Sequence, residues 1–221
     1  MSISNFIKKS AKFSFKSAKD YYQSRLNAQR TKEAYQVLRK FSCPYRLHLG
    51  CGENRFEGWI NIDLNSGDLM WDLTQKTPFA DASCNFIYSE HVIEHFPVDM
   101  GIKIFTECYR ILQSGGVMRV AMPSLESIVE NYTSGKWQDQ DWIKSGKYGD
   151  YSFIKTGAEM LNYSLRNWGH QWVYDSEELQ RRLNEAGFKK TKMLDWGISN
   201  HGELSNRETR QDSKLIYEAE K

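Results

Sequence analysis

Cysteines, prolines and long apolar runs are all scarce in this chain. Its four cysteines (Cys43, Cys51, Cys84 and Cys108) form no C-x-x-C pair, which argues against a zinc knuckle and against a disulfide framework. No run reaches the roughly 20 apolar residues that span a bilayer. The first residues also lack the apolar stretch and cleavage site of a signal peptide. These absences indicate a reducing compartment, and we expect a cytoplasmic protein.

The first forty residues contain neither glycine nor proline and carry most of the charge asymmetry. Residues 1–41 hold ten Lys or Arg against two acids, a net charge of +8, so the remaining 180 residues hold −6 of the overall +2. Apolar residues recur there at roughly helical spacing, which predicts a basic amphipathic extension over residues 1–43. Such a face can lie on an anionic membrane, where each Lys or Arg contributes about 1 kcal/mol. It can also contact nucleic-acid phosphates or dock on its own domain.

From Pro44 onward, short apolar runs alternate with helical patterns, which predicts one domain over residues 44–221. The alternation indicates an α/β fold with a mainly parallel sheet, helices against it and ligands at the carboxyl ends of the strands. Gly115-Gly116 predicts the turn between a helix and the next strand, and Asp175 or Ser176 can cap a helix that ends at Gly187. We expect strands at 45–49, 59–63, 69–71, 85–89, 117–122, 189–196 and 214–219, and helices at 99–112, 124–132 and 175–186.

A segment at 134–172 interrupts this alternation. It is rich in Gly, Ser, Trp, Tyr and charged residues without a clear period, and an insertion of this size in an α/β domain often forms a substrate lid. Its aromatic residues between Trp137 and Trp172 suit a sugar-stacking or lipid-facing acceptor pocket, although aromatic residues also seal irregular segments. The polar stretch 200–213 predicts a surface loop.

The chain is organised around a glycine turn that follows its first strand. Gly50-Cys51-Gly52 comes directly after the apolar run 45–49, and a second run ends at Asp63. Glycines at this place let the backbone approach a ligand, and an acid at the next strand end can bind the hydroxyls of a ribose. Dinucleotide sites place that acid about 20 residues further on, but Asp63 follows Gly52 by only 11 positions. The third glycine of G-x-G-x-x-G is replaced by Arg55, so the turn alone is a weak signal.

Six short motifs follow one another in a fixed order along the domain. They are Leu47-His48-Leu49-Gly50-Cys51-Gly52, Gly58-Trp59-Ile60-Asn61-Ile62-Asp63, Asp72-Leu73, Pro78-Phe79-Ala80-Asp81-Ala82-Ser83, Ile87-Tyr88-Ser89-Glu90-His91-Val92-Ile93-Glu94-His95 and Leu112-Gln113-Ser114-Gly115-Gly116. This ordered set resembles the class I S-adenosylmethionine-dependent methyltransferases, and more narrowly the methyltransferase type 11-like family, over about residues 45–196. The resemblance implies a Rossmann-like fold with a seven-stranded, mostly parallel sheet, preceded here by the helical extension.

This resemblance also implies a cofactor, S-adenosyl-L-methionine, and the residues that would hold it. The glycine turn at 50–52 would place its backbone against the methionine part, and Asp63 would bind the ribose. The short 53–58 segment replaces the usual first helix, so Asn54 or Arg55 would contribute to affinity. The implied cofactor-binding residues are Gly50, Cys51, Gly52, Asp63, Asp72 and Leu73 beside the adenine, and Ser89 and Glu90 with His91 below the sulfonium.

Two histidines are candidates for the general base. A hydroxyl acceptor must lose its proton near the transition state, and histidine is the usual proton acceptor. His91 follows the fourth strand, and His170 lies in Asn167-Trp168-Gly169-His170-Gln171-Trp172. Alternatively, His91 forms a wall of the cofactor pocket, and His170 is a loop residue bonded to backbone.

The run His91-Val92-Ile93-Glu94-His95 also matches H-x-x-E-H, in which two histidines one turn apart bind zinc and the glutamate is the base. That site needs a continuous helix and a third ligand. Here the run directly follows a strand and is interrupted by Pro97. We therefore expect no metal site, and a packing role or a supporting hydrogen bond for His95.

The sequence thus predicts an enzyme that methylates a small-molecule or glycan-type acceptor, with oxygen favoured as the methylated atom. A non-catalytic module that binds S-adenosylmethionine is the alternative, since its cofactor motifs would look the same. A nucleic-acid methyltransferase is a lesser alternative, because the domain carries −6 and only residues 1–41 could supply a basic surface. Residues 1–41 could also bring the enzyme to an anionic membrane surface.

Overall fold

The computed structural model describes residues 30–146 and 149–221. Residues 1–29 lie outside this range, and with them most of the expected amphipathic extension; residues 30–38 are helical. The chain divides into two compact units, Met1–Phe41 and Ser42–Lys221. In the described part of the chain, no helix has the length and apolarity needed to cross a membrane.

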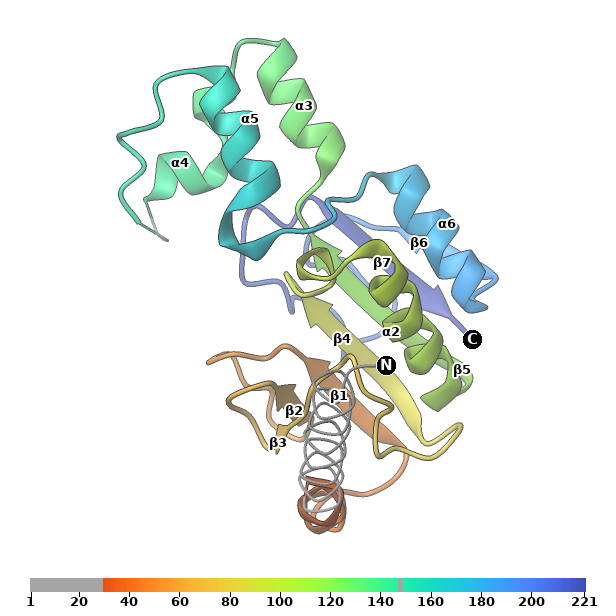
Figure 1. Cartoon of the computed structure of the whole chain (residues 1–221). Helices are drawn as coiled ribbons and strands as arrows, with labels where there is room; N and C mark the ends of the chain where they lie inside the picture. The colour runs from red at the N-terminus through yellow and green to blue at the C-terminus, as the bar shows by residue number, and fades with distance from the viewer. Residues whose placement is uncertain (1–29, 147–148) are drawn as a thin grey trace, which may run out of the picture. The chain divides into compact units, whose positions relative to one another are not determined.

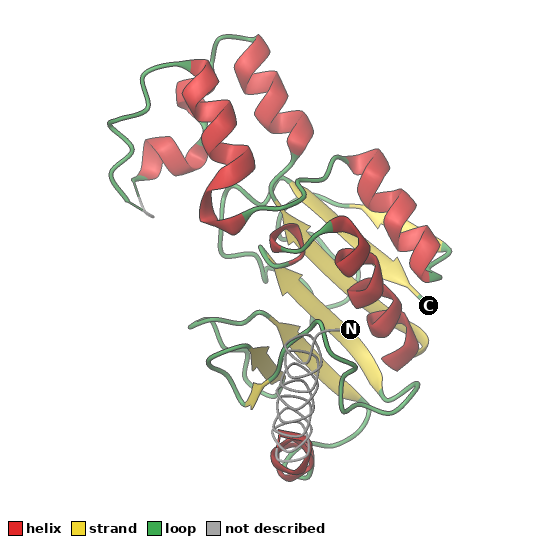
Figure 2. Ribbon diagram, viewed as in Figure 1, coloured by secondary structure: helices red, strands yellow, loops and turns green. Residues whose placement is uncertain are grey.

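The second unit is built on one sheet of seven strands in the order β3-β2-β1-β4-β5-β7-β6 (Figures 1 and 2). Strand β7 runs antiparallel to both of its neighbours, β5 and β6, and the other pairs are parallel. This sheet confirms the predicted Rossmann-like fold. The strands are β1 (Tyr45–Leu49), β2 (Ile60–Asp63), β3 (Leu69–Met70), β4 (Cys84–Glu90), β5 (Leu112–Met122), β6 (Lys190–Met193) and β7 (Leu215–Glu220).

Two helices pack against each other on one face of the sheet, α2 (Val98–Ile111) and α6 (Ser176–Ala186) (Figure 1). Helix α2 buries Ile104, Phe105, Cys108 and Ile111 along one side, as the period of an amphipathic helix requires. Helix α6 has the predicted ends. The Asp175 side chain accepts the N–H of Glu178, and Gly187 ends the helix in the left-handed conformation with φ of 118°.

The segment between β5 and α6 forms a separate group of short helices at the carboxyl end of the sheet (Figure 2). The sequence predicts only the first of them. They pack on a core of Ile128, Trp142, Tyr151, Ile154 and Met160. The helices are α3 (Leu125–Thr133), η2 (Trp137–Asp139), α4 (Asp141–Ser145), α5 (Gly157–Arg166) and η3 (Asn167–Gly169).

This insertion leaves and rejoins the rest of the chain at one point. Ser124 and Tyr174 form a parallel bridge, and the N–H of Leu125 donates to the Tyr174 carbonyl at 2.9 Å. The Ser124 side chain also accepts the N–H of Ser127, which caps α3. The two ends of the insertion are therefore fastened to each other beside the end of β5.

The prediction of a turn at Gly115-Gly116 is wrong. Both glycines lie inside β5, at a shift of the β4–β5 register. Gly115 has φ of 74°, its N–H donates to the Lys221 carbonyl at 2.9 Å, and the Gly116 carbonyl accepts the N–H of Lys221 at 3.0 Å. Glycine permits a bulge at this place, so the strand continues where a turn was predicted.

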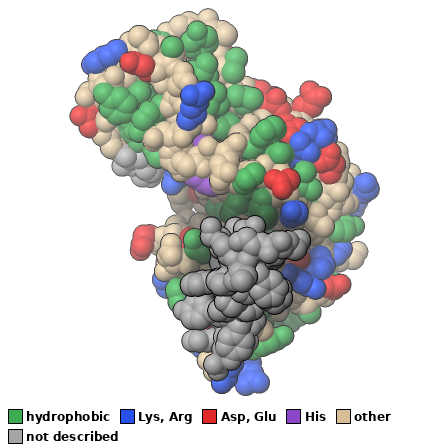
Figure 3. Space-filling model, viewed as in Figure 1, with side chains coloured by type: hydrophobic (Ala, Val, Ile, Leu, Met, Phe, Trp, Pro, Cys, Tyr) green, Lys and Arg blue, Asp and Glu red, His purple; other side chains and the backbone are tan. Residues whose placement is uncertain are grey.

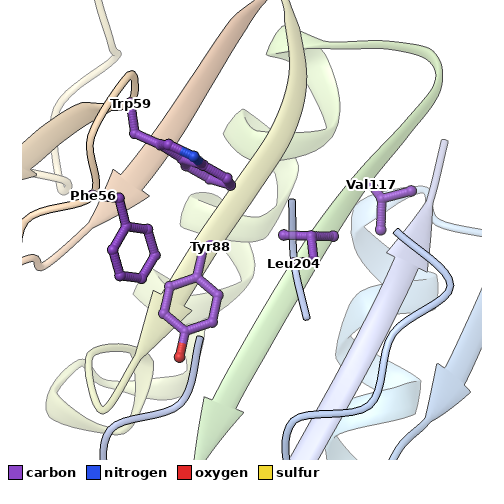
Figure 4. Packing of buried hydrophobic residues seen from close by; sticks show 5 residues of the cluster. All are labelled: Phe56, Trp59, Tyr88, Val117 and Leu204. Carbon is purple, nitrogen blue, oxygen red and sulfur yellow. The ribbon is translucent and has the colours of Figure 1, made fainter. Parts of the chain in front are cut away.

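The prediction of a surface loop at 200–213 is wrong in part, because this segment supplies residues to the core. Leu204 is fully buried and packs with Phe56, Trp59, Tyr88 and Val117. Figure 4 shows this cluster on the face of the strands away from helix α2. An apolar sheet face must be covered. Because the short 53–58 segment after β1 forms no helix that could cover it, loop residues cover this face instead.

Candidate active site

The carboxyl ends of β1, β2 and β4 lie next to one another. In the parallel register, Leu49 pairs with Ile62 of β2 and with Ser89 of β4. The residues that follow these strands therefore meet at one edge. Strand order reverses at β1, and ligands of open α/β sheets bind in the crevice at such a point. The structure thus brings together most of the residues that the sequence analysis assigns to the cofactor.

The glycine turn has two different requirements for glycine. Gly50 has φ of 64°, and an added Cβ would lie 2.2 Å from Val92 Cγ2, so packing excludes a side chain there. Gly52 has φ of 50°, but no atom lies within 4 Å of its Cβ position. The N–H of Cys51 donates to the Ile62 carbonyl at 3.1 Å, which fixes the turn on β2. Gly52 therefore presents open backbone to a ligand.

Cys51 contributes backbone rather than its thiol to this turn. Its side chain is buried, and its Sγ lies 3.1 Å from the place of a Cβ on Gly67. Burial and the nearby charge of Asp63 raise the pKa of the Cys51 thiol. The thiol is thus a packed, protonated group.

The Asp63 carboxylate lies at the end of β2, half-buried and held from two sides. Its Oδ2 accepts the N–H of Gly52 at 3.2 Å, and its Oδ1 accepts the N–H of Asn65 at 3.0 Å. These bonds hold the carboxylate beside the open glycine. An acid so placed fits a ribose diol, which donates hydrogen bonds to a carboxylate.

Asp72 and Leu73 follow β3, and the Trp71 N–H donates to the Asp63 carbonyl at 2.9 Å. Asp72 Oδ1 accepts the N–H of Thr74 at 2.9 Å and its hydroxyl at 2.7 Å. This oxygen is therefore engaged in its own turn, while the half-buried Leu73 offers an apolar contact at the edge.

Ser89 and Glu90 end β4 and differ in their surroundings. Ser89 is fully buried, and its hydroxyl has no hydrogen-bond partner among the described residues. The loop before β7 supplies the hydrogen-bond donors to the Glu90 carboxylate. Its carboxylate accepts the N–H and hydroxyl of Thr209, the N–H of Arg210 and the hydroxyl of Ser213. Glu90 thus anchors that loop to the strand end.

His91 has both ring nitrogens engaged. Its Nε2 lies 3.1 Å from Ser213 Oγ, and its Nδ1 lies 3.2 Å from Glu94 Oε1. Glu94 is fully buried. Burial opposes its ionisation, but the neighbouring imidazoles of His91 and His95 outweigh burial and hold the pKa of this carboxyl below its ordinary value.

His170 approaches the same place from the end of the insertion. Its Nδ1 lies 2.8 Å from the Ser164 carbonyl, and its ring centroid lies 5.1 Å from that of His95. Because a carbonyl only accepts, Nδ1 carries the proton of the neutral ring and Nε2 keeps its lone pair. Burial lowers the pKa of His170. Figure 3 shows histidine at the surface where the insertion meets the sheet.

A cavity of about 520 Å³ opens between this strand edge and the insertion. Its lining includes Asp212 and Lys214, which are not among the predicted site residues. The topology explains their place. The last strand runs antiparallel to β5 and so begins at the edge where the parallel strands end, and the residues just before it must lie at that edge. The lining includes His91, Ser124, Trp142, Trp168, Asp212 and Lys214.

Comparisons with known proteins show what this chain is similar to. A family model described as a methyltransferase domain matches residues 65–120, and no curated protein matches. A S-adenosylmethionine-dependent methyltransferase of Thermotoga maritima has 14% identity and a TM-score of 0.48 over 92% of this chain and 96% of its own. One from Archaeoglobus fulgidus has 17% identity and a TM-score of 0.46 over 86% and 94%.

A further similar structure is that of PigF with SAH, at 11% identity and a TM-score of 0.46. The match covers 84% of this chain, which spans only about half (53%) of PigF.

The family model of a methyltransferase domain covers residues 65–120, and the sheet of the whole unit has the order of the predicted Rossmann-like fold. The family resemblance of the sequence motifs implies S-adenosylmethionine as the cofactor. The residues at the strand edge fit this molecule, since the open backbone of Gly52 and the held carboxylate of Asp63 adjoin the glycine turn.

Proposed function

We propose that this enzyme methylates a hydroxyl group of a small-molecule or glycan-type acceptor. The observation that carries the proposal is the cavity of about 520 Å³ beside the cofactor edge. Its walls combine tryptophan rings with carboxylate, amide and hydroxyl groups, a composition that suits an acceptor with several hydroxyls. The insertion supplies one wall, in keeping with the lid expected at 134–172.

Gly50, Gly52 and Asp63 would hold the cofactor, and Ser89 and Asp72 would border it. The cofactor supplies a methyl group on a positively charged sulfur, so that a carbon–oxygen bond forms as the carbon–sulfur bond breaks and the acceptor proton leaves. The chain's own contribution is to hold the two partners in line. Positioning of this kind supplies about 7–11 kcal/mol in well-oriented systems.

Trp168 is the residue best suited to stack on an acceptor ring. It takes a left-handed conformation with φ of 55°, which is unfavourable for a bulky residue. It packs edge-on against Trp142 and Tyr163, at centroid distances of 5.2 and 5.0 Å, yet remains 39% exposed. Strain of this kind persists where the surroundings impose it, often at ligand sites.

Of the two candidate bases, His170 is better placed to meet the acceptor hydroxyl. His91 has a partner at each ring nitrogen. His170 lines the cavity, and its Nε2 has no hydrogen-bond partner among the described residues. We therefore assign hydroxyl activation to the part of the cavity that His170 lines.

Calorimetric titration with S-adenosylmethionine and S-adenosylhomocysteine, with ATP and NAD as controls, tests the cofactor site. We expect micromolar binding of the two sulfur ligands alone. Hydroxylated acceptors, sugars first, are then screened for methyl incorporation, with a Trp168→Ala variant as the pocket control. Cofactor binding without turnover of any hydroxylated acceptor would favour the non-catalytic module.

Residues 1–41 are proposed to bring the enzyme to an anionic membrane surface from the cytoplasm. Their net charge of +8 supports this. Sedimentation with anionic vesicles, with and without residues 1–41, tests it. Loss of vesicle binding on deletion is expected, with cofactor affinity unchanged.

A further inference from the structure

Three side chains with metal-ligating atoms meet beside the acceptor cavity. One ligand atom each from Glu94, His95 and His170 lies within 4.8 Å of the others. A tetrahedral ion about 2.1 Å from its ligands holds them about 3.4 Å apart. Side-chain movements of about 1 Å would therefore close the three atoms around a single ion.

The buried Glu94 carboxylate has an imidazole beside one of its two oxygens only. Its side chain has 0% exposure, and neither oxygen accepts a hydrogen bond from any residue in the described ranges. The His91 Nδ1 lies 3.2 Å from Oε1, which leaves Oε2 without a polar partner. A buried carboxylate in this state is costly unless a cation or donors compensate it.

His170 is oriented as metal-binding histidines are. Its Nδ1–H points to the Ser164 carbonyl at 2.8 Å, which leaves the Nε2 lone pair available. Histidines that bind metals almost always donate their other ring N–H to a carbonyl or carboxylate, which fixes both the tautomer and the ring plane.

The two parts of the cluster are fastened together, although they are far apart in the chain. The Glu94 carbonyl accepts the N–H groups of Gln171 and Trp172, at 2.8 and 3.1 Å. The Gln171 side chain donates to the His95 carbonyl at 2.7 Å. These bonds join the turn η1 (Ile93–His95) to the segment that carries His170, so the three side chains are assembled before any ion binds.

We propose that Glu94, His95 and His170 bind one divalent transition-metal ion with an open position toward the acceptor. Two imidazoles and one carboxylate favour zinc, manganese, iron or cobalt over magnesium and calcium. Both histidines line the cavity, so an acceptor hydroxyl can occupy the open position. The ligands differ from the His–His pair of H-x-x-E-H, and the third comes from the insertion.

This inference rests on the proposed function and extends it. A bound cation lowers the pKa of a coordinated oxygen, so the hydroxyl loses its proton to water in the cavity before the carbon–oxygen bond forms. His170 then acts as a ligand rather than as the proton acceptor.

The full-length protein, freed of metal by a chelator, is titrated with Co²⁺, Zn²⁺, Mn²⁺ and Mg²⁺. Binding is measured by calorimetry, and for Co²⁺ also by its visible absorption. We expect one transition-metal ion per chain. The variants Glu94→Gln and His170→Asn each remove a proposed ligand and should weaken binding by more than the roughly 10- to 100-fold that loss of a supporting partner costs, whereas His201→Asn, outside the cavity, should not.

Substitution of the buried Glu94 can impair folding, so the His170→Asn variant gives a second test. The His170 side chain is half-buried and lies in a loop, where a substitution disturbs packing less. No binding by the wild type, or binding that survives both substitutions, would overturn the cation site. A parallel titration with S-adenosylmethionine separates the two proposals. Cofactor binding without cation binding rejects only the cation site, and cation binding without cofactor binding rejects the proposed methyl transfer.

Discussion

Glu90 and Thr209 are joined across 119 positions by both oxygens of one carboxylate. The N–H of Thr209 lies 2.9 Å from Glu90 Oε1 and 3.0 Å from Oε2, and the Thr209 hydroxyl donates to Oε2 at 2.7 Å. The loop held in this way carries Asp212 and Lys214 into the cavity wall. The end of β4 therefore supports the acceptor side of the site.

Replacement of Glu90 by Gln tests whether this residue serves the loop or the cofactor. We expect stability to fall by about 1–3 kcal/mol, since charge-assisted bonds to the loop before β7 are lost, with affinity for S-adenosylmethionine within twofold of wild type. Urea denaturation and calorimetry measure the two quantities, and the exposed Glu57→Gln is the control. A large loss of cofactor affinity at unchanged stability would instead place Glu90 at the cofactor.

Replacement of Asp63 by Ala should weaken cofactor binding by about 1–3 kcal/mol, because the ribose hydroxyls lose their charged acceptor. Calorimetry with S-adenosylhomocysteine measures the change. Asp195→Ala, an exposed aspartate after β6, is the matched control and should bind as the wild type does. Equal affinities for the two variants would remove Asp63 from the ribose site.

Alanine at each glycine of the turn should have a different effect. In Gly50→Ala the new Cβ meets Val92 Cγ2 at 2.2 Å, so the protein should lose stability well beyond the cost of a left-handed alanine, about 1–2 kcal/mol. In Gly52→Ala only that cost is expected, because the Cβ position is open, but cofactor affinity should fall sharply. Thermal unfolding and calorimetry on both variants separate packing from binding.

His48 should make the protein less stable in mild acid. Burial lowers its pKa from 6.5 to about 4, and its ring stacks on Phe56 at 4.1 Å. The unfolded chain takes up the proton first as pH falls, so stability present above pH 6.5 is lost toward pH 4, by up to about 3 kcal/mol. As the pH is lowered through this range, the urea concentration at the unfolding midpoint should fall less steeply for His48→Phe than for the wild type. Parallel profiles would contradict the assignment.

Arg119 should be essential to stability. Its Nε lies 2.6 Å from Glu208 Oε1, and both side chains have 0% exposure. Arg119→Met leaves Glu208 buried without its cation, which costs about 3–5 kcal/mol. The control Arg181→Met removes a half-exposed pair, and it should cost no more than about 1 kcal/mol. Similar denaturation midpoints for the two variants would show that Glu208 finds another partner.

The parts of the fold that follow local rules could be predicted from the sequence. Helix α6 has a capping aspartate, one apolar face and a terminal glycine, and residues after parallel strands must meet at one edge. The bulge at Gly115 could not be predicted, because a glycine pair signals a turn equally well. Of the helices in the insertion, α3 was predicted, whereas α5 was missed although Thr156 and Glu159 form a capping box at its start, a pattern that the sequence shows.

The meeting of Glu94 with His170 was also beyond prediction. It depends on three hydrogen bonds between η1 and residues 171–172, none of which leaves a pattern in the sequence. A tertiary contact of this kind turns a motif that fails as a helical zinc site into a different ligand set.

The Ser124–Tyr174 bridge makes the insertion an exchangeable part. Because its two ends are fastened side by side, a related segment of different length could replace residues 125–173 without moving β5 or α6. Evolution could then alter which molecules are methylated while the cofactor half stays fixed. The same exchange would carry His170 with it, so a change of acceptor and a change of metal requirement would be inherited together.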